Sequence, residues 1–382
     1  MNMKTLTDES IALLREMIEI PSPSFHEERV CGCISSFLSE RGIAHSMLFN
    51  NIIAVSCGYS PEKKTLMLCA HTDTVQACSG YDFDPYSPDT AEAAAALGLP
   101  EDGLIPGLGS NDDGASAVSM IAAFRHFYDK ELPFNLMLVL SAEEERSGAN
   151  GMDAVMKAMA DGRLRAENGT VIRKPDYAIV GEPTGMLAAI AERGLLVIDA
   201  EARGTSGHAA RSEGVNAIYK AMEDIGKLRA FRFGKISPLM GEVRLSVTQI
   251  EAGTAHNVIP DSCRFVVDIR PTERYCNAEI MEMLQAECAS VLTARNLANR
   301  SSATFPDSPL AACAESLGIG TFVSPTTSDW MRLDCDAVKM GPGDSSRSHR
   351  KNEYATESEI RDAVEIYVKF IESYGNTLEQ RN

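Results

Sequence analysis

Polar side chains that could bind metal or move protons follow three short apolar runs of the chain. His71 and Asp73 come directly after TLMLCA, Glu143–Glu145 follow FNLMLVLSA, and Glu182 follows YAIVG. In open α/β sheets, ligands bind beyond the carboxyl ends of the strands. We therefore expect these side chains to meet at one edge of a sheet.

Two loops add further candidates. GLGSNDDG (residues 107–114) carries Asp112 and Asp113 ahead of an apolar helix, and GPGDSSRSH (residues 341–349) ends in His349. The first loop could be taken for a phosphate-binding loop. However, it lacks the lysine of the P-loop pattern and places two carboxylates where an anion would sit. We therefore exclude phosphate binding there.

Each of these features alone has an ordinary structural explanation. A His–Asp pair is common in folded proteins, an aspartate can cap the helix that follows it, and three consecutive glutamates are usually a solvated charge run. Their conjunction is more specific. Two histidines and several carboxylates after separate strands form a nitrogen-and-oxygen ligand set that suits zinc, cobalt or manganese.

A pair of adjacent metal ions requires a bridging carboxylate, one further carboxylate for each ion and one histidine for each ion. The chain offers that set in His71, Asp112, Glu145, Glu182 and His349. Glu144 remains as a general base beside the water that metals ~3.5–4 Å apart would activate, while they also polarise a carbonyl. The residues predict metal-assisted hydrolysis.

The elements that would position these residues alternate between helices and buried strands. Helical spacing of apolar residues predicts helices before Pro21, before Gly42 and over 357–374. The three apolar runs are too short for buried helices and favour strands of a parallel sheet.

The segment from about 187 to 300 has a different pattern. Three stretches alternate apolar and polar side chains, which is typical of a half-exposed antiparallel sheet: Leu195–Ala202, Glu242–Ile250 and Cys263–Arg270. Helices are expected over Asn216–Leu228 and Asn277–Arg295 to cover the other face. This pattern predicts an inserted α+β domain.

Composition limits the class of protein. The chain has 382 residues, enough for two or three domains, and its net charge of −18 argues against nucleic acid and anionic membranes as partners. No run approaches the ~20 apolar residues of a membrane span, and the first residues do not resemble a secretion signal. The ten cysteines contain no CxxC pair, so we expect reduced thiols. We predict a cytoplasmic protein with a small-molecule substrate.

Over nearly the whole chain, the motifs resemble those of the M20 family of metallopeptidases and amidohydrolases. The motifs that carry the resemblance are HTDTV (71–75), GLGSNDDG (107–114), SAEEERSG (141–148), VGEPT (180–184), GTSGHAAR (204–211), HNVIPD (256–261) and GPGDSSRSH (341–349). Within the family the chain is most similar to acetylornithine and succinylornithine deacetylases, and succinyl-diaminopimelate desuccinylases are close relatives of these.

The resemblance implies an α/β fold of two domains. The zinc-peptidase-like catalytic domain would comprise residues 1–186 and 301–382, with a mixed, mainly parallel sheet flanked by helices. The inserted α+β domain, residues 187–300, would serve as a lid and as the dimerisation surface of a homodimer.

The resemblance also assigns roles at the metal site. His71, Asp112 and Glu182 would bind one divalent ion, and Asp112, Glu145 and His349 the other. The metal would be zinc, with cobalt or manganese as alternatives. Asp73 would orient His71 through its far ring nitrogen. In the family pattern the base precedes the ligand, which makes Glu144 the base and Glu145 the ligand; the third glutamate leaves a shift by one residue open. Asp113 receives no role.

Three further residues of the inserted domain match the family's substrate contacts. His208 would stabilise the oxyanion, acting on the partner's site in a dimer, and its alternative is an ordinary histidine at a sheet edge. Asn257 and Arg270 would hold the substrate carboxylate, which a guanidinium can bind through two hydrogen bonds. The alternative for Arg270 is a surface salt bridge.

The activity implied is removal of the acetyl or succinyl group from an N-acyl-L-ornithine in arginine biosynthesis. The alternatives are a succinyl-diaminopimelate desuccinylase and a di- or tripeptidase. A non-catalytic metal-binding or regulatory relative is a further alternative, against which the complete set of ligands and a glutamate base argue.

Overall fold

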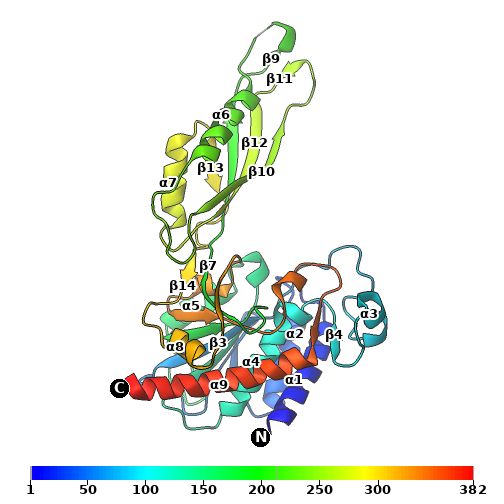
Figure 1. Ribbon diagram of the computed structural model, residues 1–382, viewed down its shortest axis with the longest axis vertical. Helices are drawn as coiled ribbons and strands as arrows, with labels where there is room; N and C mark the ends of the chain where they lie inside the picture. Colours follow the sequence, from blue (N-terminus) through cyan, green and yellow to red (C-terminus); the bar gives the residue numbers. More distant parts are fainter. Residues whose placement is uncertain (1, 212, 382) are drawn as a thin grey trace. The chain divides into compact units, whose positions relative to one another are not determined.

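The computed structural model describes residues 2–211 and 213–381, which form two compact units (Figure 1). The larger unit takes in the described residues up to Ile190, then Thr304–Phe322 and the chain from Ser328 onward. The smaller unit comprises Ala191–Ala303 together with Val323–Thr327. The insertion expected at 187–300 thus differs from the smaller unit by a few residues at each end and lacks the short return segment 323–327.

The helices and strands of the larger unit alternate along the chain, as the apolar runs predict. Its helices are α1 (Met3–Ile18), α2 (Glu28–Glu40), α3 (Thr90–Leu97), α4 (Ala115–Phe127), α5 (Met152–Ala160), α8 (Pro309–Ser316) and α9 (Glu357–Arg381). Its strands are β1 (His45–Leu48), β2 (Asn51–Val55), β3 (Thr65–His71), β4 (Leu104–Pro106), β5 (Asn135–Ser141), β6 (Tyr177–Val180), β16 (Asp336–Lys339) and β17 (Tyr354–Thr356). Strands β7 (Ala188–Glu192) and β15 (Thr321–Ser324) lie where the chain passes between the units.

The main sheet has the order β1-β2-β5-β3-β6-β16-β7. Strands β5, β3, β6 and β16 are parallel, whereas β1, β2 and β7 join antiparallel to their neighbours. The three apolar runs TLMLCA, FNLMLVL and YAIV form the adjacent parallel strands β3, β5 and β6. The expected mixed, mainly parallel sheet is therefore confirmed.

Both faces of this sheet are buried because successive side chains of a strand point to opposite faces. Leu66 and Leu68 of β3 pack in the cluster formed with α1, α2, α4, α8 and α9, while Met67 and Cys69 pack on the other face with α5 and Trp330. Figure 1 shows α9 running beside α1 and α4. Burial on both faces explains why the strand sequences are continuously apolar.

The smaller unit has an α+β fold, with one layer of helices packed on one antiparallel sheet. Its four-stranded antiparallel sheet has the order β10-β12-β8-β13, and α6 and α7 pack on one face of it. Buried and exposed side chains alternate along β8, as the sequence pattern predicts. The elements are β8 (Leu196–Arg203), β9 (Gly207–His208), α6 (Ala217–Ala230), β10 (Arg244–Ala252), β11 (Val258–Ile259), β12 (Ser262–Arg270), α7 (Asn277–Glu287), β13 (Val291–Ala294) and β14 (Ser302–Ala303).

The helix expected over Asn277–Arg295 is wrong in its second half. Helix α7 ends at Glu287, and β13 follows it and pairs antiparallel with β8. The buried carboxylate of Asp224 accepts the N–H groups of Ala289 and Ser290 at 3.1 and 2.7 Å, which turns the chain. The β-branched residues after this turn then complete the edge of the sheet.

Among the described residues, no helix has the length and apolar character needed to cross a bilayer. All ten cysteines are free thiols, in agreement with the absence of CxxC pairs from the sequence. The fold is therefore held by its buried apolar faces and hydrogen bonds, without disulfide cross-links.

Candidate metal centre

The ends of three parallel strands carry the polar residues that the sequence singles out. In the register of β3 with its neighbours, His71 lies opposite Ser141 of β5, and Cys69 lies opposite Val180 of β6. The chain leaves β5 toward Glu143–Glu145 and leaves β6 toward Glu182 at this same edge. The strand order thus brings together side chains that are far apart in the sequence.

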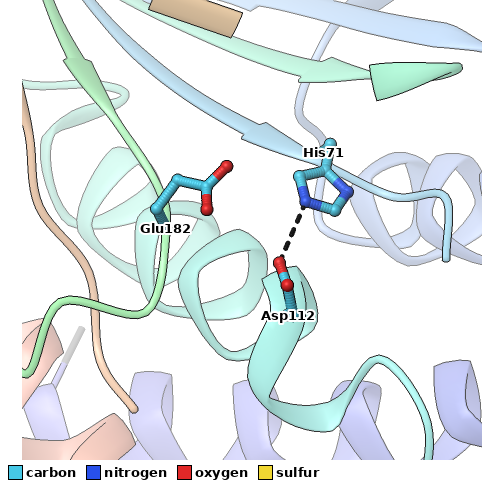
Figure 2. Close-up of side chains that lie close together, drawn as sticks. All are labelled: His71, Asp112 and Glu182. Carbon is cyan, nitrogen blue, oxygen red and sulfur yellow. Dashed lines mark hydrogen bonds and ion pairs between the residues drawn. The ribbon is translucent and has the colours of Figure 1, made fainter. Parts of the chain in front are cut away.

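The first candidate metal group consists of His71, Asp112 and Glu182, whose ligand atoms all lie within 4.8 Å of one another. Figure 2 shows the imidazole and both carboxylates directed toward a common point. His71 Nε2 is 3.2 Å from Asp112 Oδ1. Asp112 belongs to the helical turn Ser110–Gly114 that leads into α4. Both His71 and Asp112 are buried.

The second candidate group consists of Asp112, Glu145 and His349, again with ligand atoms within 4.8 Å. His349 Nε2 lies 2.9 Å from Glu145 Oε1 and 3.7 Å from Asp112 Oδ2. Asp112 is shared, with one carboxylate oxygen directed at each histidine. The structure thus assembles the five predicted ligands into two adjacent groups around one carboxylate, and metal binding by them stays a prediction.

The three consecutive glutamates point in different directions. The carboxylate of Glu143 accepts the main-chain and side-chain N–H groups of Asn150, each at 3.0 Å, and so faces away from the ligands. Glu145 faces His349. The carboxyl of Glu144 lies near those of Glu182 and Asp329. This geometry supports the alignment with Glu145 as ligand and Glu144 as base over a shift by one residue.

Asp73 has a role that the sequence did not indicate. His71 Nδ1 is 2.9 Å from the main-chain oxygen of Asp73 and 3.6 Å from its carboxylate. The carboxylate instead accepts hydrogen bonds from Ser24 Oγ at 2.7 Å and from the N–H groups of Glu144 and Glu145 at 3.0 and 3.1 Å. Asp73 therefore orients His71 chiefly through its backbone, and its carboxylate holds the turn that carries Glu144 and Glu145.

Negative charge accumulates in this buried site. Burial, reinforced by Glu182, Asp329 and Glu145, raises the pKa of Glu144 well above its usual range. Burial likewise raises the pKa of Glu182, although the buried ammonium of Lys339 opposes the shift. Each carboxyl thus resists ionisation chiefly because it is buried, and its acidic neighbours add to this effect.

The histidines shift in the opposite direction. Burial alone would lower the pKa of His71, but its contacts with Asp112 and Asp73 outweigh burial and raise it well above its usual value. The hydrogen bond with Glu145 raises the pKa of His349 to about 9. Both histidines are thus protonated more readily than a free imidazole, because carboxylates face them.

These observations fit a pair of divalent cations. The ligand atoms are imidazole nitrogens and carboxylate oxygens, the set that zinc and other divalent transition metals bind. Cations would also offset the negative charge of the carboxylates that are buried together here, including Glu182, whose pKa is raised. The chemistry of the site therefore agrees with metal binding by the two groups, without selecting one metal.

The sequence missed three buried residues that support the site. Glu353 Oε1 accepts the N–H groups of Asn111 and Asp112 at 3.0 and 2.9 Å, and Asp329 accepts a hydrogen bond from Ser141 at the end of β5. Glu353 has one sequence signal, its place four residues after His349. The third residue, Asn111, directly precedes Asp112 in the chain.

Asp113 lies outside both metal groups. Burial raises the pKa of its carboxyl to about 7. It packs beneath Gly181, where an added Cβ would come within 2.7 Å of Asp113 Oδ2. We assign it no part in metal binding.

The remaining predicted residues, His208, Asn257 and Arg270, belong to the smaller unit. His208 is exposed, its Nδ1 accepts the N–H of Ala210 at 3.2 Å, and it pairs with Val258 between β9 and β11. The guanidinium of Arg270 binds the carboxylate of Asp268 at 2.9 and 3.1 Å, the salt bridge that was its alternative explanation. The main-chain oxygen of Asn257 accepts a hydrogen bond from Ala209.

Comparison with known proteins identifies relatives over most of the chain. The family model described as peptidase family M20/M25/M40 matches residues 67–373. An acetylornithine deacetylase from Myxococcus xanthus is 28% identical over 83% of this chain and 81% of that enzyme. A succinyl-diaminopimelate desuccinylase from Cereibacter sphaeroides is 25% identical over 95% of this chain and 98% of that enzyme.

Solved structures share the fold. An M20 family metallo-carboxypeptidase from Sulfolobus solfataricus superposes with a TM-score of 0.74 at 16% identity, covering 97% of this chain and 100% of that one. A dinuclear metal-binding peptidase of the M20 family from Bacillus subtilis superposes with a TM-score of 0.67 at 15% identity, covering 96% and 98%.

Protons and metal should compete for the site. The raised pKa values mean that, without metal, the folded protein holds protons on Glu144, Glu182, His71 and His349 that the unfolded chain releases. The stability of the metal-free protein should therefore fall as the pH rises above about 4.5, the usual glutamate value, and further above about 6.5, the usual histidine value. Zinc should raise the melting temperature more at about pH 7.5 than at about pH 5. Thermal denaturation of chelator-treated and zinc-restored protein measures this, and equal shifts at both pH values would contradict it.

Proposed function

The chain belongs to peptidase family M20/M25/M40 and is a metal-dependent hydrolase of amide bonds, and we propose that it removes the acetyl or succinyl group from N-acyl-L-ornithine. The observation that carries the proposal is the pair of ligand groups sharing Asp112, with the carboxyl of Glu144 beside them. We propose that two zinc ions bind there, with cobalt or manganese as alternatives.

Each of the two ligand groups would hold one metal ion. His71, Asp112 and Glu182 would hold one ion, and Asp112, Glu145 and His349 the other. When bound, a metal pair supplies Lewis acidity toward a carbonyl oxygen and makes water more acidic. The protein side chains must then move the proton and hold the substrate.

We assign the proton transfer to Glu144. Its carboxyl takes a proton from the attacking water and delivers it to the leaving amine, so it must both accept and release one. Burial and acidic neighbours raise its pKa well above the usual range, which makes it a stronger base than an ordinary carboxylate. The hydrogen bond from its N–H to Asp73 fixes the turn that carries it.

The nature of the acyl-amino acid rests on the relatives and on charge. Relatives named as deacetylases and as desuccinylases match at 25–28% identity, so both acyl groups are supported. N-Acetyl-L-ornithine balances one carboxylate with one ammonium group, whereas succinyl-diaminopimelate has three carboxylates and one ammonium group. A protein with a net charge of −18 repels the more anionic substrate more strongly. This difference favours an acylornithine as the substrate. The reaction would then be a step of arginine biosynthesis in the cytoplasm.

We further propose that the protein is a homodimer in which His208 donates a hydrogen bond to the oxyanion in the partner's site. Asn257 and Arg270 would bind the substrate carboxylate. To do so, Arg270 would have to release the carboxylate of Asp268 and bind the carboxylate of the substrate instead. Support for these roles comes from the motif resemblance.

Replacing Glu144 with Gln removes the proton acceptor while preserving size. Turnover should fall by about 10²–10⁴-fold, the usual contribution of a general base, while the bound metal stays unchanged. Steady-state kinetics and metal analysis of the same preparation measure both quantities. The matched control is Glu143→Gln, since Glu143 faces Asn150 and should retain turnover within several-fold. Loss of turnover in Glu143→Gln with activity kept in Glu144→Gln would assign the base to Glu143.

Complementation tests the role of His208 and the dimer together. His208→Ala and Glu144→Gln should each be nearly inactive alone. Mixed dimers should regain activity, because one site then combines an intact Glu144 with the partner's intact His208. Sedimentation velocity establishes the dimer, and activity of the re-associated mixture measures the recovery. A monomer, or a mixture no more active than its components, would refute the proposed action across subunits.

The substrate is tested by release of free amino acid from N-acetyl-L-ornithine, N-succinyl-L-ornithine, N-succinyl-diaminopimelate and a dipeptide. Each is assayed with metal-stripped protein and after restoration of zinc or cobalt. We expect metal-dependent release of ornithine, and the ratio of the two ornithine rates identifies the acyl group. Release from diaminopimelate or dipeptide substrates alone would replace the acylornithine proposal and leave the metal site intact.

A further inference from the structure

Asn111, the residue before the shared ligand Asp112, is fully buried and connects two ligand-bearing loops. Its side chain makes three hydrogen bonds, all to the segment that precedes His349. Nδ2 donates to the carbonyl of Asp344 at 3.2 Å and to Ser348 Oγ at 3.3 Å, and Oδ1 accepts the N–H of Asp344 at 2.9 Å. The amide thus spans both ends of the turn that leads to His349.

The loop that leads to His349 has a glycine, Gly343, where the amide of Asn111 approaches it. Gly343 has a φ of 85°, a conformation that glycine adopts without strain. A Cβ built on Gly343 would collide with Asn111 Oδ1. The close approach of the two loops therefore depends on both residues.

The backbone around Asp112 is held separately. Glu353 Oε1 accepts the N–H groups of Asn111 and Asp112, and its main-chain oxygen accepts the N–H of Gly107 at 3.0 Å. Loss of the Asn111 amide would leave these bonds in place. Its effect should therefore fall on the loop that carries His349 rather than on Asp112.

His349 is the more weakly enclosed of the two histidine ligands. Its side chain is 55% exposed, against 3% for His71, and its φ of 57° lies in the left-handed region. Asp344 caps the turn before it: its carboxylate accepts the N–H of Ser346 at 2.7 Å, and its carbonyl accepts the N–H of Arg347 at 2.9 Å. The hydrogen bonds of Asn111 at both ends of this turn fasten it to the Asp112 loop, whereas Thr184 pairs with Asp344 on the side of Glu182. The position of His349 relative to Asp112 is therefore set in part by Asn111.

We propose that Asn111 is a positioning residue that sets the separation of His349 and Asp112, and so determines metal binding by the second group, Asp112, Glu145 and His349. The inference rests on the proposed metal sites. The first group should depend less on the Asn111 side chain, because His71 comes from β3 and the loop of Glu182 keeps its own backbone hydrogen bonds from Thr184 and Met186 to Gly341. Asn111 thus tunes one of the two metal positions.

The test is titration of metal-stripped protein with cobalt(II) chloride, followed by calorimetry and visible absorption. The wild-type protein should bind two equivalents. Asn111→Ala should bind one equivalent as the wild type does and the other about 10–100-fold more weakly, the usual effect of losing a residue that supports a ligand. Excess cobalt should restore the wild-type spectrum, which a misfolded protein would not recover.

Asn135→Ala is the matched control. Asn135 is also fully buried in the larger unit, and its amide accepts the N–H of Ser60 at 2.9 Å and donates to the Ser60 carbonyl at 2.7 Å. It begins β5, at the sheet edge opposite the metal groups. This variant should lose thermal stability yet bind both equivalents with wild-type affinity.

Three results would overturn the inference: wild-type affinity for both equivalents in Asn111→Ala, equal weakening of both, or the same selective loss in Asn135→Ala. A wild-type protein that binds fewer than two equivalents would instead refute the two-metal proposal, and this inference with it. If Asn111→Ala does not fold, the test uses Gly343→Ala. Its added Cβ would displace the side-chain amide of Asn111 without removing it. The same single equivalent should then weaken, and wild-type binding in that variant would overturn the inference.

Discussion

The structure depends on one electrostatic constraint, the burial of several carboxylates at the carboxyl ends of parallel strands. Glu144 and Glu182 are each buried where ionisation is unfavourable, as their raised pKa values show. Buried charges are tolerated when they are paired or coordinate metal. A pair of divalent cations bound by the two ligand groups would offset this concentration of acidic side chains.

Main-chain N–H groups hold the ligand-bearing loops in place. Asp73 accepts those of Glu144 and Glu145, Glu353 accepts those of Asn111 and Asp112, and the amide of Asn111 reaches the loop of His349. Carboxylates that bind backbone donors position the loop without competing for the metal position. The site thus contains carboxylates with two functions. Those of the metal groups face one another, whereas those of Asp73 and Glu353 accept backbone N–H groups and order the loops.

Much of this arrangement was predictable. The continuously apolar runs predicted β3, β5 and β6. The residues that follow these runs supplied three of the five predicted ligands, His71, Glu145 and Glu182, because a parallel sheet places the carboxyl ends of its strands at one edge. The other two, Asp112 and His349, came from the loops 107–114 and 341–349. The prediction of a helix through Arg295 was wrong, since Asp224, some 65 residues earlier in the chain, binds the backbone where α7 ends. Helical periodicity is a local signal and contains no information about such a distant partner.

The sequence by itself determined the fold class, the family and the chemical type of each candidate ligand, because these depend on residue type, local spacing and strand patterns. The tertiary structure alone decided which glutamate of Glu143–Glu145 faces His349, how the carboxylate of Asp73 is used, and that Glu353 and Asn111 support the Asp112 loop. The physical reason is that each of these outcomes depends on a hydrogen bond between segments distant in the chain. Only the packing of the sheet and its loops brings such partners within bonding distance.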